Sequence, residues 1–181
     1  MDKKQENLNL INSFIEHLKV EKRCSLHTLT AYNTDLLQFN SFLTQTYDLL
    51  IIDLKFTLAR SFILELINQN ISNRSIARKL STIKSFYKFL IKEQIIDSSP
   101  VVNLQAPKTQ KRLPQFIKQA EMFKLYDIDF FSNDFPGLRD YMIINLFYKT
   151  GIRLSELINL KEHDVSKREI KVTGKRNKQR I

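Results

Sequence analysis

The most informative stretch of this 181-residue sequence surrounds one arginine, Arg153. It follows a Thr-Gly pair, Thr150 and Gly151, which predicts the end of a helix. Apolar spacing typical of a helix resumes at Leu154 and continues through Leu157. A guanidinium there would lie at a helix N-terminus, beside backbone N–H groups that favour a phosphate. An ordinary amphipathic helix with a solvated Arg153 is the alternative interpretation.

The octet Thr-Gly-Ile-Arg-Leu-Ser-Glu-Leu at residues 150–157 resembles the motif around the first catalytic arginine of the tyrosine recombinases, the phage-integrase and Xer class. Residues 25–36 and 75–90 resemble Xer-type members in particular. The resemblance implies a site-specific recombinase that cuts and rejoins DNA through a covalent 3′-phosphotyrosine intermediate, with chromosome dimer resolution as its role. A mobile-element integrase or an invertase would carry the same two domains.

This chemistry makes two demands on the side chains around the phosphate. Preorganised cations must stabilise the charge on the non-bridging oxygens, and an arginine fork matches two of them without titrating. The leaving 5′-hydroxyl also needs a proton from a general acid. The resemblance gives the first role to Arg153 and the second to Lys175, in the turn Gly-Lys-Arg-Asn-Lys at residues 174–178. This turn has Arg176 where the family usually has glycine. The alternative interpretation of Lys175 is a solvated residue at the tip of the hairpin, without a catalytic role.

The resemblance gives Glu156 a supporting role. A carboxylate three residues after Arg153 lies on the same side of a helix, where it can orient its neighbours. It could equally be an acid favoured by the helix dipole. The family's His-x-x-Arg pair and nucleophilic tyrosine lie beyond position 181, and none of the six tyrosines here occupies the nucleophile's place in chain order. The resemblance therefore predicts a C-terminally truncated chain that is inactive by itself.

The surrounding elements predict a mainly α fold. Apolar residues step by three and four through four segments, which predicts an N-terminal four-helix bundle over residues 1–99, the SAM-like core-binding domain of the resemblance. Residues 100–117 hold three of the four prolines and no acid, which predicts an extended basic linker. Residues 118–181 would begin an α+β catalytic domain. Its predicted elements are helices at 118–126, 138–148 and 154–160, a strand at 168–173 and a return strand from 178, forming a β-hairpin.

The net charge of +10 favours a polyanionic partner, with nucleic acid ahead of an anionic membrane. We expect double-stranded DNA, bound by a homo- or hetero-tetramer on paired sites when the enzyme is complete. The candidate DNA-binding residues are Thr28, Arg74, Arg78, Lys84, Lys108 and Arg112. A solvated basic face is the alternative for these residues, and a non-catalytic DNA-binding protein is the alternative for the chain.

Composition predicts a cytoplasmic protein without cofactor or metal. The single cysteine, Cys24, cannot form an internal disulfide, and it has no metal-ligand spacing with the three histidines. No run of 18 apolar residues exists, so we expect no membrane span.

Overall fold

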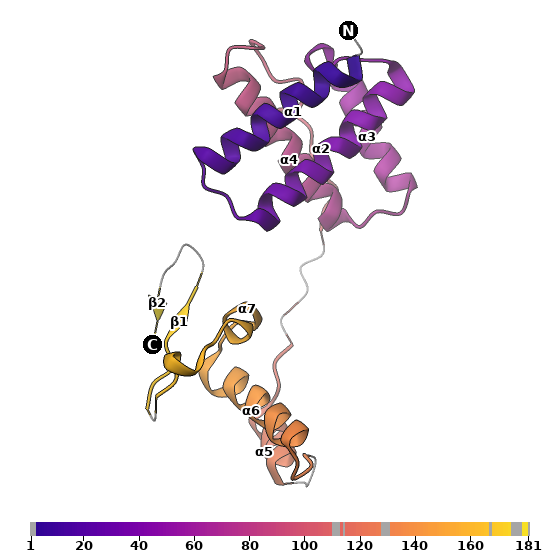
Figure 1. The fold of residues 1–181 in the computed structure, drawn as a ribbon. Helices are drawn as coiled ribbons and strands as arrows, with labels where there is room; N and C mark the ends of the chain where they lie inside the picture. The colour runs from indigo at the N-terminus through magenta and orange to yellow at the C-terminus, as the bar shows by residue number, and fades with distance from the viewer. Residues whose placement is uncertain are drawn as a thin grey trace. The chain divides into compact units, whose positions relative to one another are not determined.

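The computed structural model describes residues 3–109, 113, 115–127, 131–166, 168–174 and 179–180. The chain forms two compact units, Met1–Arg112 and Leu113–Ile181 (Figure 1). Helices predominate in both, which confirms the predicted mainly α fold. Within the described ranges, no helix has the length and apolar character needed to cross a lipid bilayer.

Four long helices form the N-terminal unit, as the apolar spacing predicts (Figure 1). They are α1 (Lys3–Val20), α2 (Leu26–Tyr47), α3 (Phe56–Asn68) and α4 (Asn73–Lys92), with a short 3-10 helix, η1 (Ile51–Asp53), between α2 and α3. Two serines determine where helices begin. Ser25 Oγ accepts the Thr28 N–H at 3.3 Å, and Ser72 Oγ accepts the Ser75 N–H at 3.3 Å. Each serine therefore satisfies an N–H group that the first turn leaves unpaired, at the starts of α2 and α4.

Aromatic side chains fill the centre of the bundle. Phe14 of α1 meets Phe86 of α4 edge to face, with ring centroids 5.4 Å apart. Tyr87 is fully buried, and its hydroxyl donates to the Ile51 carbonyl oxygen at 2.6 Å. Burial raises the pKa of Tyr87 far above its ordinary value, so the phenol stays protonated. Tyr87 is thus a core residue of the bundle.

The N-terminal unit extends beyond residue 99, where we predicted the linker to begin. Val101 is fully buried and Leu104 is 5% exposed, and both belong to the core of the bundle. Lys84 of α4 adds a polar contact, because its Nζ donates to the Val102 carbonyl oxygen at 3.1 Å. The prolines and basic residues of this segment predict an extended linker, but two of its apolar residues, Val101 and Leu104, pack into the bundle.

One buried carboxylate joins α2 to α4. Asp35 is fully buried and accepts hydrogen bonds from Lys79 Nζ at 3.0 Å and Thr82 Oγ1 at 3.1 Å. Arg78 Nη1 forms an ion pair with the same carboxylate. The Lys79 side chain is only 10% exposed, so the ammonium and the carboxylate each compensate for the water that the other has lost.

The C-terminal unit contains short helices followed by a hairpin. The described elements are α5 (Gln119–Asp127), α6 (Phe135–Thr150), α7 (Leu154–Ile158), a 3-10 helix η2 (Glu162–Asp164), β1 (Val172–Thr173) and β2 (Gln179–Arg180). The strands pair antiparallel, with Val172 opposite Arg180 and Thr173 opposite Gln179, which confirms the predicted hairpin. β1 is shorter than the predicted strand at 168–173, since Ile170 forms an isolated bridge with Val165 instead.

Helix α6 begins at Phe135, earlier than the predicted start at residue 138. The Asp134 carboxylate caps this start by accepting the Gly137 N–H at 3.0 Å. Pro136 suits the first turn, where its missing N–H costs nothing. The capping pattern therefore decides the boundary, because the apolar spacing becomes regular only further along.

Replacing Asp35 with Asn should lower the free energy of unfolding of the N-terminal unit by about 3–5 kcal/mol, because Lys79 would keep a buried charge without its partner. Asp48→Asn is the matched control, because Asp48 forms an ion pair with Lys3 at 2.7 Å on the surface. The Asp48 side chain is 79% exposed. That surface pair should contribute about 1 kcal/mol or less. Urea denaturation followed by circular dichroism measures both changes, and equal losses would contradict the role given to Asp35.

Candidate functional site

Three residues with different roles build the turn before Arg153. Helix α6 ends at Thr150 and is capped by Gly151, whose φ of 61° lies in the left-handed region that glycine adopts without strain. Thr150 Oγ1 donates to the Leu146 carbonyl oxygen at 2.6 Å and accepts the Ile152 N–H at 3.2 Å. Ile152 is only 5% exposed, and its burial anchors the chain at this point. The sequence Thr-Gly-Ile therefore places Arg153 directly before α7.

Arg153 is the N-cap residue of α7, the position that the sequence predicts. Its backbone is extended, with φ −80° and ψ 151°, and its side chain is 68% exposed. Helix α7 has only 5 residues, so its dipole is small. The charge at this site therefore comes from side chains.

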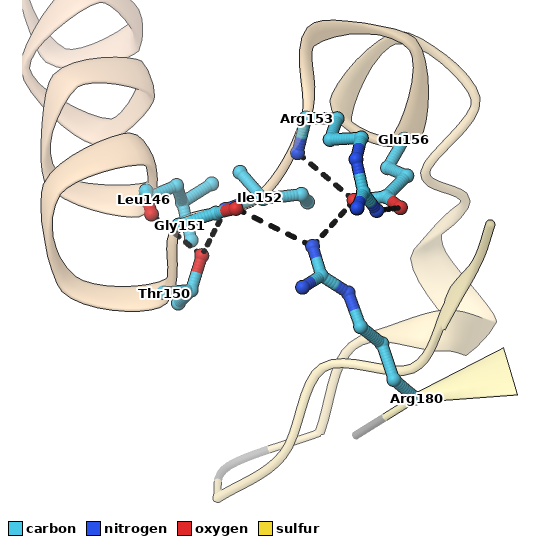
Figure 2. Close-up of polar contacts among 7 residues, drawn as sticks. All are labelled: Leu146, Thr150, Gly151, Ile152, Arg153, Glu156 and Arg180. Atoms are coloured by element: carbon cyan, nitrogen blue, oxygen red, sulfur yellow. Dashed lines mark hydrogen bonds and ion pairs between the residues drawn. The ribbon is translucent and has the colours of Figure 1, made fainter. Parts of the chain in front are cut away.

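Glu156 holds both the backbone and the side chain of Arg153. Its own side chain is only 2% exposed. Oε2 accepts the Arg153 backbone N–H at 2.9 Å, and Oε1 accepts Arg153 Nη1 at 2.8 Å (Figure 2). The backbone hydrogen bond from Arg153, with further side-chain bonds from Arg153 and Arg180, lowers the pKa of Glu156 from 4.5 to about 2. Glu156 is therefore ionised at neutral pH, and it makes the contacts expected of an N-terminal acid and of an orienting group.

A second arginine reaches the same carboxylate from the hairpin. Arg180 Nη2 donates to Glu156 Oε2 at 2.6 Å and to the Gly151 carbonyl oxygen at 3.3 Å (Figure 2). Arg180 is not among the residues that the sequence predicts for the site, because several basic residues surround it and none has a distinguishing local pattern. The register of the hairpin places Arg180 opposite Val172. Its carboxylate partner, Glu156, lies 24 residues earlier in the chain.

The three side chains suit an oxyanion. Two arginines and one carboxylate give a net charge of +2 − 1 = +1, and the acid is buried behind the two cations. The Arg153 and Arg180 side chains are 68% and 44% exposed. An approaching phosphate would thus meet guanidinium groups that are already held in place, which is the arrangement that stabilises developing negative charge.

The other predicted catalytic residue, Lys175, lies outside the described residues, as does Arg112 of the predicted DNA-binding set. Their roles therefore stay predictions. Lys108 is exposed, and its backbone carbonyl oxygen accepts a hydrogen bond from Asn73 Nδ2 at 2.8 Å.

The predicted DNA-binding residues of the bundle differ in their surroundings. Arg74 is exposed on α4, and Thr28 is half-buried in the first turn of α2. Arg78 and Lys84 also have partners inside the protein, the carboxylate of Asp35 and the backbone after α4 respectively. The Arg78 side chain is still 48% exposed, so it can hold Asp35 and present a charge to solvent at the same time.

Two family models match the chain in the order of its two units. The model of the phage integrase N-terminal SAM-like domain matches residues 11–94. The model of the phage integrase family matches residues 115–181.

Curated relatives and a solved structure agree with these matches. The tyrosine recombinase XerC of Staphylococcus haemolyticus is 40% identical over 174 residues, covering 93% of this chain and 57% of the relative. That of Staphylococcus epidermidis is 40% identical over 183 residues, covering 100% of this chain and 59% of the relative. The chain thus spans about 57–59% of the length of these two relatives. The XerH site-specific recombinase bound to its difH substrate in a pre-cleavage complex shares the fold, with a TM-score of 0.62 and 17% identity over 94% of this chain and 50% of that chain. On this evidence the chain belongs to the phage integrase family and is similar to the XerC tyrosine recombinases.

Proposed function

We propose that this chain acts in site-specific DNA recombination of the Xer type, in chromosome dimer resolution. The observation that carries the proposal is the buried Glu156 carboxylate, which holds Arg153 at the start of α7. The Arg153 side chain is nevertheless 68% exposed. The similarity to XerC relatives supports the Xer role over that of a mobile-element integrase or an invertase.

In the proposed reaction a tyrosine phenolate attacks the phosphorus and the bond to the 5′ oxygen breaks, leaving the enzyme joined to the 3′ phosphate. Arg153 stabilises the negative charge on the non-bridging oxygens as the phosphorus becomes crowded. Lys175 gives a proton to the departing 5′ oxygen. Attack by the 5′-hydroxyl of another strand reverses these steps, so the proton returns to Lys175, the tyrosine leaves and the DNA is rejoined.

Duplex DNA is the proposed partner, gripped mainly through its phosphates, by a tetramer on paired sites. The net charge of +10 supplies the long-range attraction. The proposed phosphate contacts are Thr28, Arg74, Arg78, Lys84, Lys108 and Arg112. Substitution of Arg74 gives the clearest test of these contacts, because Arg74 is exposed and forms no ion pair in the described part of the chain.

DNA binding by this chain should weaken steeply with salt, because each phosphate contact releases bound counterions. Arg74→Gln should reduce the slope of log affinity against log salt by about one unit. Arg60→Gln is the matched control, since Arg60 is exposed on the neighbouring helix α3 and is outside the proposed set. Fluorescence anisotropy between about 50 and 200 mM salt measures the slopes. Salt-independent binding, or one slope for all three proteins, would contradict the phosphate contacts.

The 181-residue chain alone should form no covalent adduct with a nicked suicide substrate, from which a cleaved strand cannot rejoin. The physical reason is the absence of a tyrosine in the nucleophile's place after the Arg153 motif. Denaturing electrophoresis of labelled DNA detects an adduct, and a catalytically competent recombinase serves as the positive control. An adduct mapped to any of the six tyrosines would overturn the placement of the active site.

In the protein translated from the complete reading frame, Arg153→Ala and Lys175→Ala should fail in different ways. Arg153→Ala should slow cleavage by about a hundredfold or more with DNA binding nearly unchanged, because it removes charge stabilisation from the transition state. Lys175→Ala should be rescued by a substrate with sulfur at the bridging 5′ position, since a thiolate leaves without a proton. Single-turnover cleavage of both substrates measures the rescue.

Equal rescue of the two variants would mean that Lys175 is not the general acid. If the complete protein binds DNA but forms no covalent adduct, the alternative of a non-catalytic DNA-binding protein would be favoured instead.

A further inference from the structure

Arg180 joins three elements through one nitrogen atom. Its Nη2 donates to the Gly151 carbonyl oxygen at the end of α6 and to Glu156 Oε2 in α7, while its backbone belongs to β2 (Figure 2). The side chain remains 44% exposed although these contacts hold it. Arg180 thus lies beside Arg153 on a shared carboxylate, and the proposed reaction gives it no role.

The side chains of the two arginines donate to different oxygens of the Glu156 carboxylate. Glu156 Oε1 accepts Arg153 Nη1, and Oε2 accepts Arg180 Nη2 together with the Arg153 backbone N–H. An arginine beside a free carboxylate commonly forms a fork with both oxygens at once. With Oε2 occupied, Arg153 engages Glu156 through one side-chain nitrogen, so the rest of its guanidinium can face an incoming oxyanion.

We propose that Arg180 is a positioning residue for Arg153: by occupying Glu156 Oε2 and the Gly151 carbonyl oxygen, it prevents a two-nitrogen fork between Arg153 and Glu156 and keeps the Arg153 guanidinium open toward the phosphate. The link to phosphate chemistry rests on the proposed function. The hairpin delivers Arg180 to this place, since the antiparallel register sets it opposite Val172, which is 6% exposed. A purely mechanical role, in which Arg180 only fastens the hairpin to the helices, is the competing explanation.

The 181-residue chain with ¹⁵N-labelled arginine separates the two explanations by NMR. The guanidinium signals of Arg153 are assigned from their loss in Arg153→Lys, and the Glu156 pKa is followed by its carboxyl ¹³C shift. In Arg180→Ala, Arg153 should change from one hydrogen-bonded side-chain nitrogen to two. The Glu156 pKa should rise above its starting value of about 2, because one cationic donor is lost.

Two further variants complete the design. Arg180→Lys keeps a charge and several donors, so it should restore a low Glu156 pKa and the one-nitrogen contact of Arg153. Lys171→Ala removes the same charge from an exposed residue just before β1 and should leave both signals unchanged. The methyl signals of Val172 report whether the hairpin stays folded.

In the protein from the complete reading frame, Arg180→Ala should slow cleavage by about tenfold or more with DNA affinity nearly unchanged, because Arg153 would be misplaced. Unchanged Arg153 signals in Arg180→Ala would overturn the proposal, and so would normal cleavage. Loss of the folded Val172 signals in both Arg180 variants would also overturn it, since Arg180 would then only support the hairpin. A complete protein that never cleaves DNA, combined with the expected NMR changes, would refute the proposed function and leave the positioning of Arg153 intact.

Discussion

A carboxylate stays ionised inside a protein only where cations and hydrogen-bond donors replace the water it has lost. This constraint organises both units. Asp35 of α2 is fully buried and held by basic residues of α4. Glu156 of α7 is held by Arg153 just before the same helix and by Arg180 of β2. Because each acid is shared between elements, satisfying its charge also decides how those elements pack.

The same arrangement presents arginines to solvent without leaving them loose. The side chains of Arg78 and Arg153 are 48% and 68% exposed, yet each is tied from behind to a buried acid. An arginine held in this way loses less conformational entropy when it meets a phosphate. Lys79 shows the other outcome, since its ammonium is 10% exposed and serves the interior alone. Exposure of the tethered cation thus separates the arginines that solvent can reach from Lys79, which only supports the fold.

Family membership and geometry give different information about the site around Arg153. The matches to the N-terminal SAM-like domain and to the phage integrase family identify the class of reaction to consider. The geometry adds two contacts that a sequence motif does not specify. The Glu156 carboxylate holds Arg153, and Arg180 of the hairpin donates to the same carboxylate. The chain spans about 57–59% of the length of two XerC relatives.

The sequence by itself determined the features that depend on neighbours along the chain. Apolar spacing predicted the four helices of the bundle, and the Thr-Gly break placed Arg153 at the start of a helix. The tertiary structure alone decided which charges meet. Arg180 and Glu156 are 24 residues apart, and Asp35 and Arg78 are 43 apart. Periodicity and capping act over one or two turns, whereas these pairs form only after separate elements pack, when a buried acid selects among many basic residues the ones that can reach it.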